Sequence, residues 1–159
     1  MTDYEILIKE AMEACMPWKA EIIRCAKRYI ETRHATRNHP KAYSSIRGPV
    51  ESPEWKEYSI LSNAYHDAYS DLWMATDVEY GDDEIANAAW NWRYWKVMAR
   101  KGCWYQKSIF TDYMASKTMR NLDDAETKLM EVCGLLELYK PSSYYIERAF
   151  PKLKMERST

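Results

Sequence analysis

Apolar side chains recur every three or four residues along most of this chain, which is the spacing of helices that bury one face. These stripes predict helices over about 2–15, 17–33, 53–80, 84–101, 104–119 and 121–140, and a short one around 144–150. No segment shows the alternation of a half-buried strand. The pattern therefore predicts an all-α fold, a compact bundle of about six to seven helices.

Local signals place several helix ends. Thr2 and Glu5 form a Thr-x-x-Glu capping box at the start of the first helix. Pro17 fits the first position of the second helix, where its missing N–H costs nothing. Ser52 before Pro53 is typical of another helix start.

Two helices carry regular seams, and a third is apolar on nearly every side. The seam residues are Tyr58, Leu61, Tyr65, Ala68, Leu72 and Ala75, and then Leu122, Ala125, Leu129, Val132 or Cys133, Leu136 and Tyr139. Apolar residues surround helix 84–101, and we expect such a helix to be central. A bundle that uses both seams internally favours a monomer.

One long connection, about 34–52, lacks an apolar period, and loops of that length tend to be functional or disordered. We expect 1–159 to form a single helical domain in which 151–159 is a frayed tail.

The composition favours an intracellular protein. The N-terminus lacks the pattern of a signal peptide, and no apolar run approaches the roughly 20 residues that span a bilayer. The four cysteines form no zinc or redox motif, and Cys15, Cys25 and Cys133 lie on apolar stripes. We therefore expect buried, reduced thiols, a cytoplasmic location and no membrane association.

Charge is divided into blocks, although the formal net charge is only -1. Residues 18–47 and 93–120 hold fifteen basic residues, whereas the charged residues of 51–84 and 121–138 are mostly acidic. Oppositely charged helices that lie side by side would pair these blocks. Alternatively, both basic blocks converge on one face that binds nucleic acid, or the acidic face 67–84 docks a basic protein or imitates nucleic acid.

Arginine and histidine six positions apart occur twice, as Arg33 with His39 and Arg28 with His34. This spacing resembles the short motif of HEPN ribonucleases, which are also all-α. The resemblance implies that the arginine steadies phosphate charge while the histidine handles the 2'-hydroxyl proton. His34 stands where that family usually has another polar residue after the arginine.

Other chemical constellations are incomplete. Glu31 and His34 form one Glu-x-x-His half-motif of a di-iron bundle, but the second is missing. Glu10 and Glu13 resemble part of the acidic motif of all-α nucleotide pyrophosphohydrolases, without a matching downstream motif. His66, Asp67 and Asp71 fall on the solvated side of their helix. We therefore predict no catalytic residue, no metal and no cofactor.

These observations favour a non-enzymatic interaction protein, an adaptor or inhibitor that docks on a larger protein, of the accessory kind encoded by phages and mobile elements. Seven tryptophans and thirteen tyrosines supply interface residue types. The expected partner-binding residues are Arg33, Arg37, Lys41, Arg47, Arg93, Lys96, Arg100, Lys101 and Trp104. The alternatives are a nucleic-acid-binding accessory protein and a HEPN-like, metal-independent ribonuclease.

Overall fold

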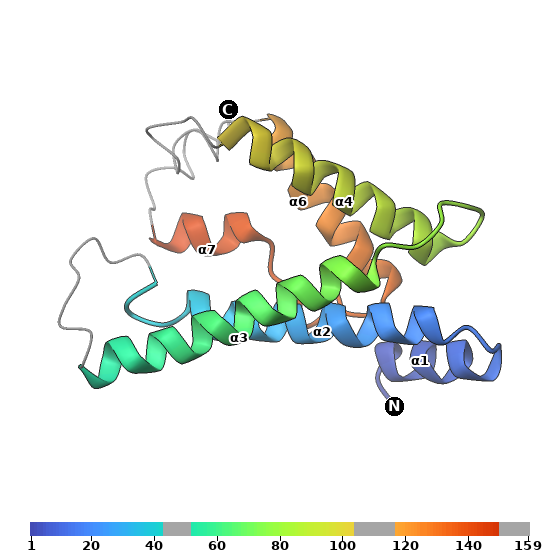
Figure 1. The fold of residues 1–159 in the computed structure, drawn as a ribbon, viewed down its shortest axis with the longest axis horizontal. Helices are drawn as coiled ribbons and strands as arrows, with labels where there is room; N and C mark the ends of the chain where they lie inside the picture. The colour runs from blue at the N-terminus through green and yellow to red at the C-terminus, as the bar shows by residue number, and fades with distance from the viewer. Residues whose placement is uncertain (43–51, 104–116, 150–159) are drawn as a thin grey trace.

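The computed structural model describes residues 1–42, 52–103 and 117–149, with side chains as far as residue 100 in the middle range. The described residues form six helices and no strand, so the predicted all-α fold is confirmed (Figure 1). The helices are α1 (Asp3–Glu13), α2 (Pro17–Arg37), α3 (Pro53–Ala75), α4 (Glu84–Cys103), α6 (Lys117–Val132) and α7 (Ser142–Ala149). The predicted helix 104–119 and the tail 151–159 lie largely outside the described residues.

The helices associate in two pairs, with α2 along α3 and α4 along α6 (Figure 1). Helix α1 packs on α2, and α7 reaches α2 through side chains such as His34 and Tyr145. Large rings fill the space where the pairs meet. Tyr29 of α2 lies 5.7 Å from Tyr65 and 6.1 Å from Trp92 between ring centroids. Aromatic side chains therefore help to join the two pairs.

The α1–α2 corner agrees with the sequence except at Cys15. The Thr2 N–H donates to Glu5 Oε2 at 3.4 Å, and Pro17 is the first residue of α2. Helix α1 ends at Glu13, and Cys15 is exposed with a φ of 57°. The expectation that Cys15 is buried on an apolar stripe was wrong. Cys15 has a left-handed backbone conformation in the turn between α1 and α2, so it lies outside the helix.

Helix α2 continues to Arg37, so the connection after it is shorter than the predicted 34–52. Tertiary hydrogen bonds support the extra turn. His34 Nδ1 lies 2.9 Å from the Tyr145 hydroxyl, and Thr36 Oγ1 donates to the Leu61 carbonyl at 3.0 Å. The last turn of α2 is thus held by α3 and α7 rather than by an apolar pattern of its own.

Two other helix ends come earlier than predicted. Helix α3 ends at Ala75 instead of near Tyr80. At this end, the buried Thr76 hydroxyl donates to the Leu72 carbonyl at 2.8 Å. Helix α6 begins at Lys117 and ends at Val132, whereas the seam predicted 121–140. Gly134 ends it with a φ of +73°, a conformation that glycine adopts at little cost.

The contact of Gly134 with α1 is very close. A Cβ at this position would lie 2.8 Å from the backbone nitrogen of Tyr4. The turn carries Leu136 to the surface, where it is half-exposed although the seam predicted it to be buried. Tyr139, at the end of the same predicted seam, is buried as expected.

Helix α4 differs most from its prediction. Its inner side is buried, through Ile85, Ala88, Ala89, Trp92 and Ala99. Its outer side is exposed, so the expectation that this helix is central was wrong. The apolar residues that surround α4 divide into one face toward α6 and the aromatic contact, and another face toward solvent.

Candidate functional site

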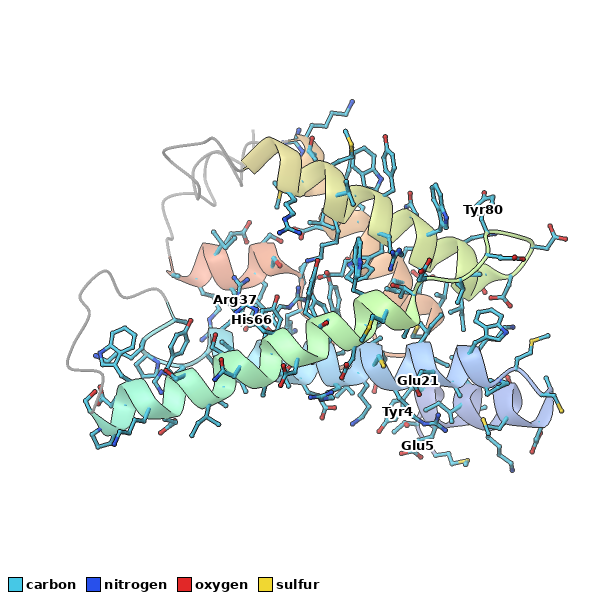
Figure 2. All side chains as sticks on the ribbon, viewed as in Figure 1. Tyr4, Glu5, Glu21, Arg37, His66 and Tyr80 are labelled. Carbon is cyan, nitrogen blue, oxygen red and sulfur yellow. The ribbon has the colours of Figure 1, made fainter. Side chains whose placement is uncertain are left out.

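Four apolar residues line the outer side of α4, and one more precedes the helix. We define the α4 strip as Tyr80, Trp90, Tyr94, Val97 and Met98, whose exposed fractions are 69, 50, 46, 40 and 37 %. Residues 90, 94, 97 and 98 share one helical face. The Tyr80 ring meets the Trp90 ring edge-on at 5.8 Å, and Figure 2 shows Tyr80 beside the start of α4. Single exposed apolar residues are ordinary, but a contiguous group of this kind is typical of an interaction site.

Polar contacts anchor α4 on the side opposite the strip, through Trp92, and along one flank, through Arg93. The Trp92 indole N–H donates to Glu126 Oε2 on α6 at 3.0 Å. The Arg93 guanidinium lies 4.0 Å from the centroid of the Trp73 ring on α3 and donates to the Trp73 carbonyl. These contacts fix the rotation of α4, so the strip is presented by a helix that is anchored to α3 and α6.

Glu126 is the centre of a buried polar group that we call the Glu126 cluster: Tyr29, Arg33, Trp92, Lys96, Glu126 and Tyr139. Oε1 of Glu126 accepts from Arg33 Nη1 at 2.6 Å and from the Tyr139 hydroxyl at 3.0 Å. Oε2 accepts from Trp92 and, at 3.1 Å, from the Tyr29 hydroxyl. Lys96 Nζ lies 3.9 Å from the same oxygen.

Arg33 links this cluster to the C-terminal part of the chain. Its guanidinium donates to the Lys140 carbonyl at 2.6 Å and to Ser142 Oγ at 3.1 Å. The rings of Tyr29, Tyr139 and Tyr145 surround it at 5.1 to 5.9 Å. Arg33 therefore joins α2, α6 and the start of α7 in a single network.

The electrostatics of the cluster oppose a catalytic role for Glu126. Burial alone would raise the pKa of this carboxyl, but Arg33, Lys96 and the donated hydrogen bonds outweigh burial and lower the pKa to about 2. A general base needs a pKa closer to the working pH and an accessible lone pair. Four hydrogen bonds occupy Glu126, so its geometry suits a structural anion that holds helices together.

The buried thiols are also chemically quiet. Burial raises the pKa of Cys133 to about 12, and burial together with the Glu21 carboxylate raises that of Cys25 to about 12. Nucleophilic cysteines have lowered pKa values, which stabilise the thiolate. The expected burial is confirmed for these two cysteines.

The structure distributes the predicted partner-binding residues over different environments. Arg33 is 1 % exposed, and its pairing in the Glu126 cluster removes it from any outer surface. Lys96 also joins that cluster, Arg93 is bound to Trp73, and Lys41 lies 3.4 Å from Glu54. Arg37 is half-buried and Arg100 is exposed. Arg47, Trp104 and the side chain of Lys101 lie outside the described residues.

Many charges of the described residues pair between helices. Arg28 of α2 lies 2.5 Å from Asp71 of α3, and Lys19 of α2 pairs with Asp83 before α4. With Arg33–Glu126 and Lys41–Glu54, these contacts join the first basic block to the acidic blocks at four places in the described residues. Pairing of this kind leaves fewer cations for an exposed basic face.

The HEPN-like residues are not brought together by the fold. Arg33 contacts α6 and the start of α7, whereas His39 Nε2 lies 3.4 Å from Glu57 on α3. In the second pair, Arg28 contacts Asp71 on α3 and His34 contacts Tyr145 on α7. Neither pair presents the arginine and the histidine to a shared phosphate position.

Potential metal ligands do not converge in the described parts of the chain, where no group of three or more histidine, cysteine, aspartate or glutamate side chains forms a site. Glu31 pairs with Lys27 at 2.8 Å rather than with His34. His66, labelled in Figure 2, and Asp67 are exposed, and Asp71 pairs with Arg28.

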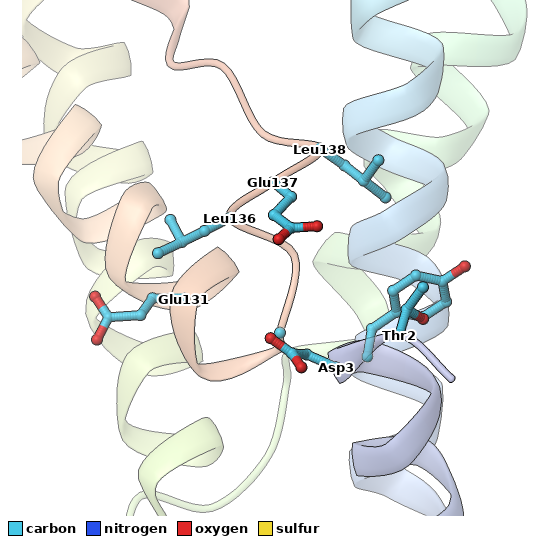
Figure 3. Close-up of a pocket in the computed structure, with 8 residues that line it drawn as sticks. Thr2, Asp3, Glu131, Leu136, Glu137 and Leu138 are labelled. Carbon is cyan, nitrogen blue, oxygen red and sulfur yellow. The ribbon is translucent and has the colours of Figure 1, made fainter.

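A separate pocket of about 340 Å³ lies between the start of α1 and the turn after α6 (Figure 3). Its lining residues are Thr2, Asp3, Tyr4, Glu131, Gly134, Leu136, Glu137 and Leu138. These walls combine carboxylates with two half-exposed leucines and hold no histidine or cysteine. The lining therefore offers no nucleophile paired with a base.

Across the described ranges, no helix is both long enough and apolar enough to cross a membrane. Comparison with protein-family models, with curated proteins and with solved structures finds no match to this chain.

Sequence reasoning missed the two groups that organise this site. Glu126 stands beside the apolar seam residue Ala125, but acids commonly flank a seam on solvated helices, so the sequence held no specific signal for its burial. The strip could not be separated from the core by pattern alone, since both faces of α4 carry apolar residues.

Proposed function

We propose that this chain is a non-enzymatic, intracellular interaction protein that acts by docking the α4 strip on another protein, as an adaptor or inhibitor does. The observation that carries the proposal is the strip itself, with Trp90 and Tyr94 half-exposed on a helix whose other side is anchored. Tryptophan and tyrosine dominate binding energy at protein interfaces. An anchored helix also loses little conformational entropy on docking.

The chemistry of the described residues supports a binding role over a catalytic one. Glu126 is an ionised, fully bonded carboxylate, and burial raises the pKa of Cys133 to about 12. The HEPN-like pairs are separated by their contacts. An intracellular location belongs to the proposal because thiols stay reduced there.

Nucleic-acid binding is the weaker alternative. It would use exposed cations such as Arg100, whereas Arg33, Arg93 and Lys96 are engaged inside the protein. Steep weakening of binding between 50 mM and 200 mM salt would support this alternative, because phosphate contacts release counterions.

The proposal is tested by affinity capture from cells that express the protein. The wild-type protein is compared with a Trp90→Ser/Tyr94→Ser variant, and the captured proteins are quantified by mass spectrometry. We expect a defined protein, other than this chain, to be lost by about tenfold or more with the variant.

The matched control is Ile60→Ser, which removes an apolar side chain that is 69 % exposed on α3, away from the strip. This control should retain the same protein, and nuclease treatment should not release it. The proposal fails if no protein other than this chain depends on the strip.

A further inference from the structure

The outer side of α4 carries a seam of its own. Asn87, Trp90, Tyr94 and Val97 follow one another at steps of three, four and three, the spacing of helices that pack side by side. The seams of α3 and α6 are used inside the molecule, where Leu72 and Leu129 are fully buried. The apolar members of the α4 seam, Trp90, Tyr94 and Val97, stay half-exposed.

The size of the α4 strip suits a modest interface. Its five side chains expose roughly 500 Å² together, given the areas typical of such residues. Two strips that cover each other completely would bury at most about 1,000 Å², which is the size of a weak, transient interface. The strip is about as large as the largest apolar patch of a typical monomer, roughly 300–600 Å², and patches of that size are often functional.

The charges around the strip favour an antiparallel pair of strips over a parallel one. Its N-terminal end lies beside the exposed carboxylates Glu79 and Asp82, and its C-terminal end beside the exposed Arg100. A parallel pair would place like charges together. An antiparallel pair separates the two Arg100 side chains, and with the axis at Tyr94 each lies opposite Ala88 of the other copy, on the side of its acidic end. This arrangement also opposes the two helix dipoles favourably.

The order of the apolar residues along α4 is also compatible with an antiparallel pair related by a two-fold axis. With the two-fold axis at Tyr94, Trp90 of one copy lies opposite Met98 of the other, because both are four residues from the axis. A thioether against an indole ring is a favourable contact. Tyr94 then meets its own equivalent, so a single patch serves both copies.

We infer that the occupant of the α4 strip in the isolated protein is a second copy of this chain, with the two α4 helices antiparallel across a two-fold axis near Tyr94. The inference rests on the proposed function, since it names a chain that covers the same strip. A different protein that docks there must displace the second copy.

Sedimentation velocity of the full chain across about 1–200 µM provides the first test. We expect a concentration-dependent dimer with a Kd on the order of 10 µM, in keeping with a small interface. The Trp90→Ser/Tyr94→Ser variant should dimerise at least about tenfold more weakly. The Ile60→Ser control should behave as the wild type. A monomeric wild type, or a dimer unaffected by the strip variant, overturns the inference.

Disulfide trapping tests the antiparallel arrangement. In a Cys15→Ser/Cys103→Ser background, Tyr94→Cys should form a covalent dimer under mild oxidation, because position 94 faces itself across the axis. Asn87→Cys should not, since the two positions lie at opposite ends of the pair. Trapping at both positions indicates a parallel pair, and trapping at neither indicates a different interface. Either result overturns the inference.

The two proposals fail in different ways. A monomeric protein that still loses a captured partner with the strip variant contradicts the second copy and leaves the proposed function intact. A trapped dimer with no other strip-dependent protein supports the second copy and contradicts docking on a different protein.

Discussion

Two groups of aromatic residues lie on opposite sides of α4, and they use the same residue types differently. On the inner side, the N–H of Trp92 is bonded to Glu126 and its ring is fully buried. On the outer side, Trp90 is half-exposed and contacts the ring of Tyr80. The inner rings belong to a charged network that fixes the fold, whereas the outer rings leave apolar area for another chain. Aromatic content alone therefore does not distinguish core from interface.

The largest expected effect is a loss of unfolding free energy when the charged network on the inner side of α4 is broken. Glu126→Gln removes the anion between Arg33 and Lys96 and leaves the buried guanidinium and the half-buried ammonium without a carboxylate partner. Breaking a buried ion pair costs about 3–5 kcal/mol of unfolding free energy. Urea denaturation measures this loss. The control Glu131→Gln, at an exposed carboxylate, should change the free energy by about 0–1 kcal/mol.

The pH dependence of stability should report the same carboxylate. The pKa of Glu126 is lowered from 4.5 to about 2 on folding, so its contribution is complete above about pH 4.5 and is lost as the pH falls toward 2. The expected loss is a few kcal/mol. Denaturation curves at pH 6, 4 and 2.5 measure it. If the unfolding free energy of the wild type varied as little with pH as that of Glu126→Gln, Glu126 would have an ordinary pKa in the folded protein.

A matched pair of tryptophan substitutions sharpens the comparison. Trp92→Phe keeps an apolar ring but removes the N–H that donates to Glu126, and we expect a loss of about 1–3 kcal/mol. Trp90→Phe makes the same change on the outer side, where the loss should stay within about 0.5 kcal/mol. Thermal and urea unfolding measure both. Equal losses would mean that the two sides of α4 do not differ as described.

The smallest effect is expected for the strip itself. Trp90→Ser/Tyr94→Ser should leave the helical circular dichroism spectrum unchanged and should alter monomer stability by less than about 1 kcal/mol, since both side chains are half-exposed. The comparison is made at a concentration where the wild type is monomeric, because dimerisation adds apparent stability. A loss above about 3 kcal/mol would place these residues in the core.

Much of the fold could be predicted from local patterns. The capping residues Thr2 and Glu5, the position of Pro17 and the start at Ser52–Pro53 were confirmed, because these signals act within one turn of the backbone. The ends of α2, α3 and α6 were misplaced. Contacts that are distant in sequence decide the ends of α2 and α6, such as Thr36 with Leu61 and Gly134 with Tyr4.

The candidate site was less predictable. Charge blocks indicated that oppositely charged helices pair, and ion pairs such as Arg28 with Asp71 agree with that interpretation. The blocks could not show that Arg33 would be buried against Glu126, 93 positions along the chain. A basic residue in a helical sequence has the same local signature whether it faces solvent or a buried carboxylate.

The sequence by itself determined that the protein is helical, where most helices begin, and which faces are apolar enough to pack, because propensity, capping and periodicity are local properties. Only the tertiary structure decided which apolar face of α4 is covered and which is left to solvent. Both faces carry tryptophan, and periodicity is unchanged by a rotation of the helix about its axis. The Trp92–Glu126 and Arg93–Trp73 contacts set that rotation and thereby turn Trp90 and Tyr94 outward.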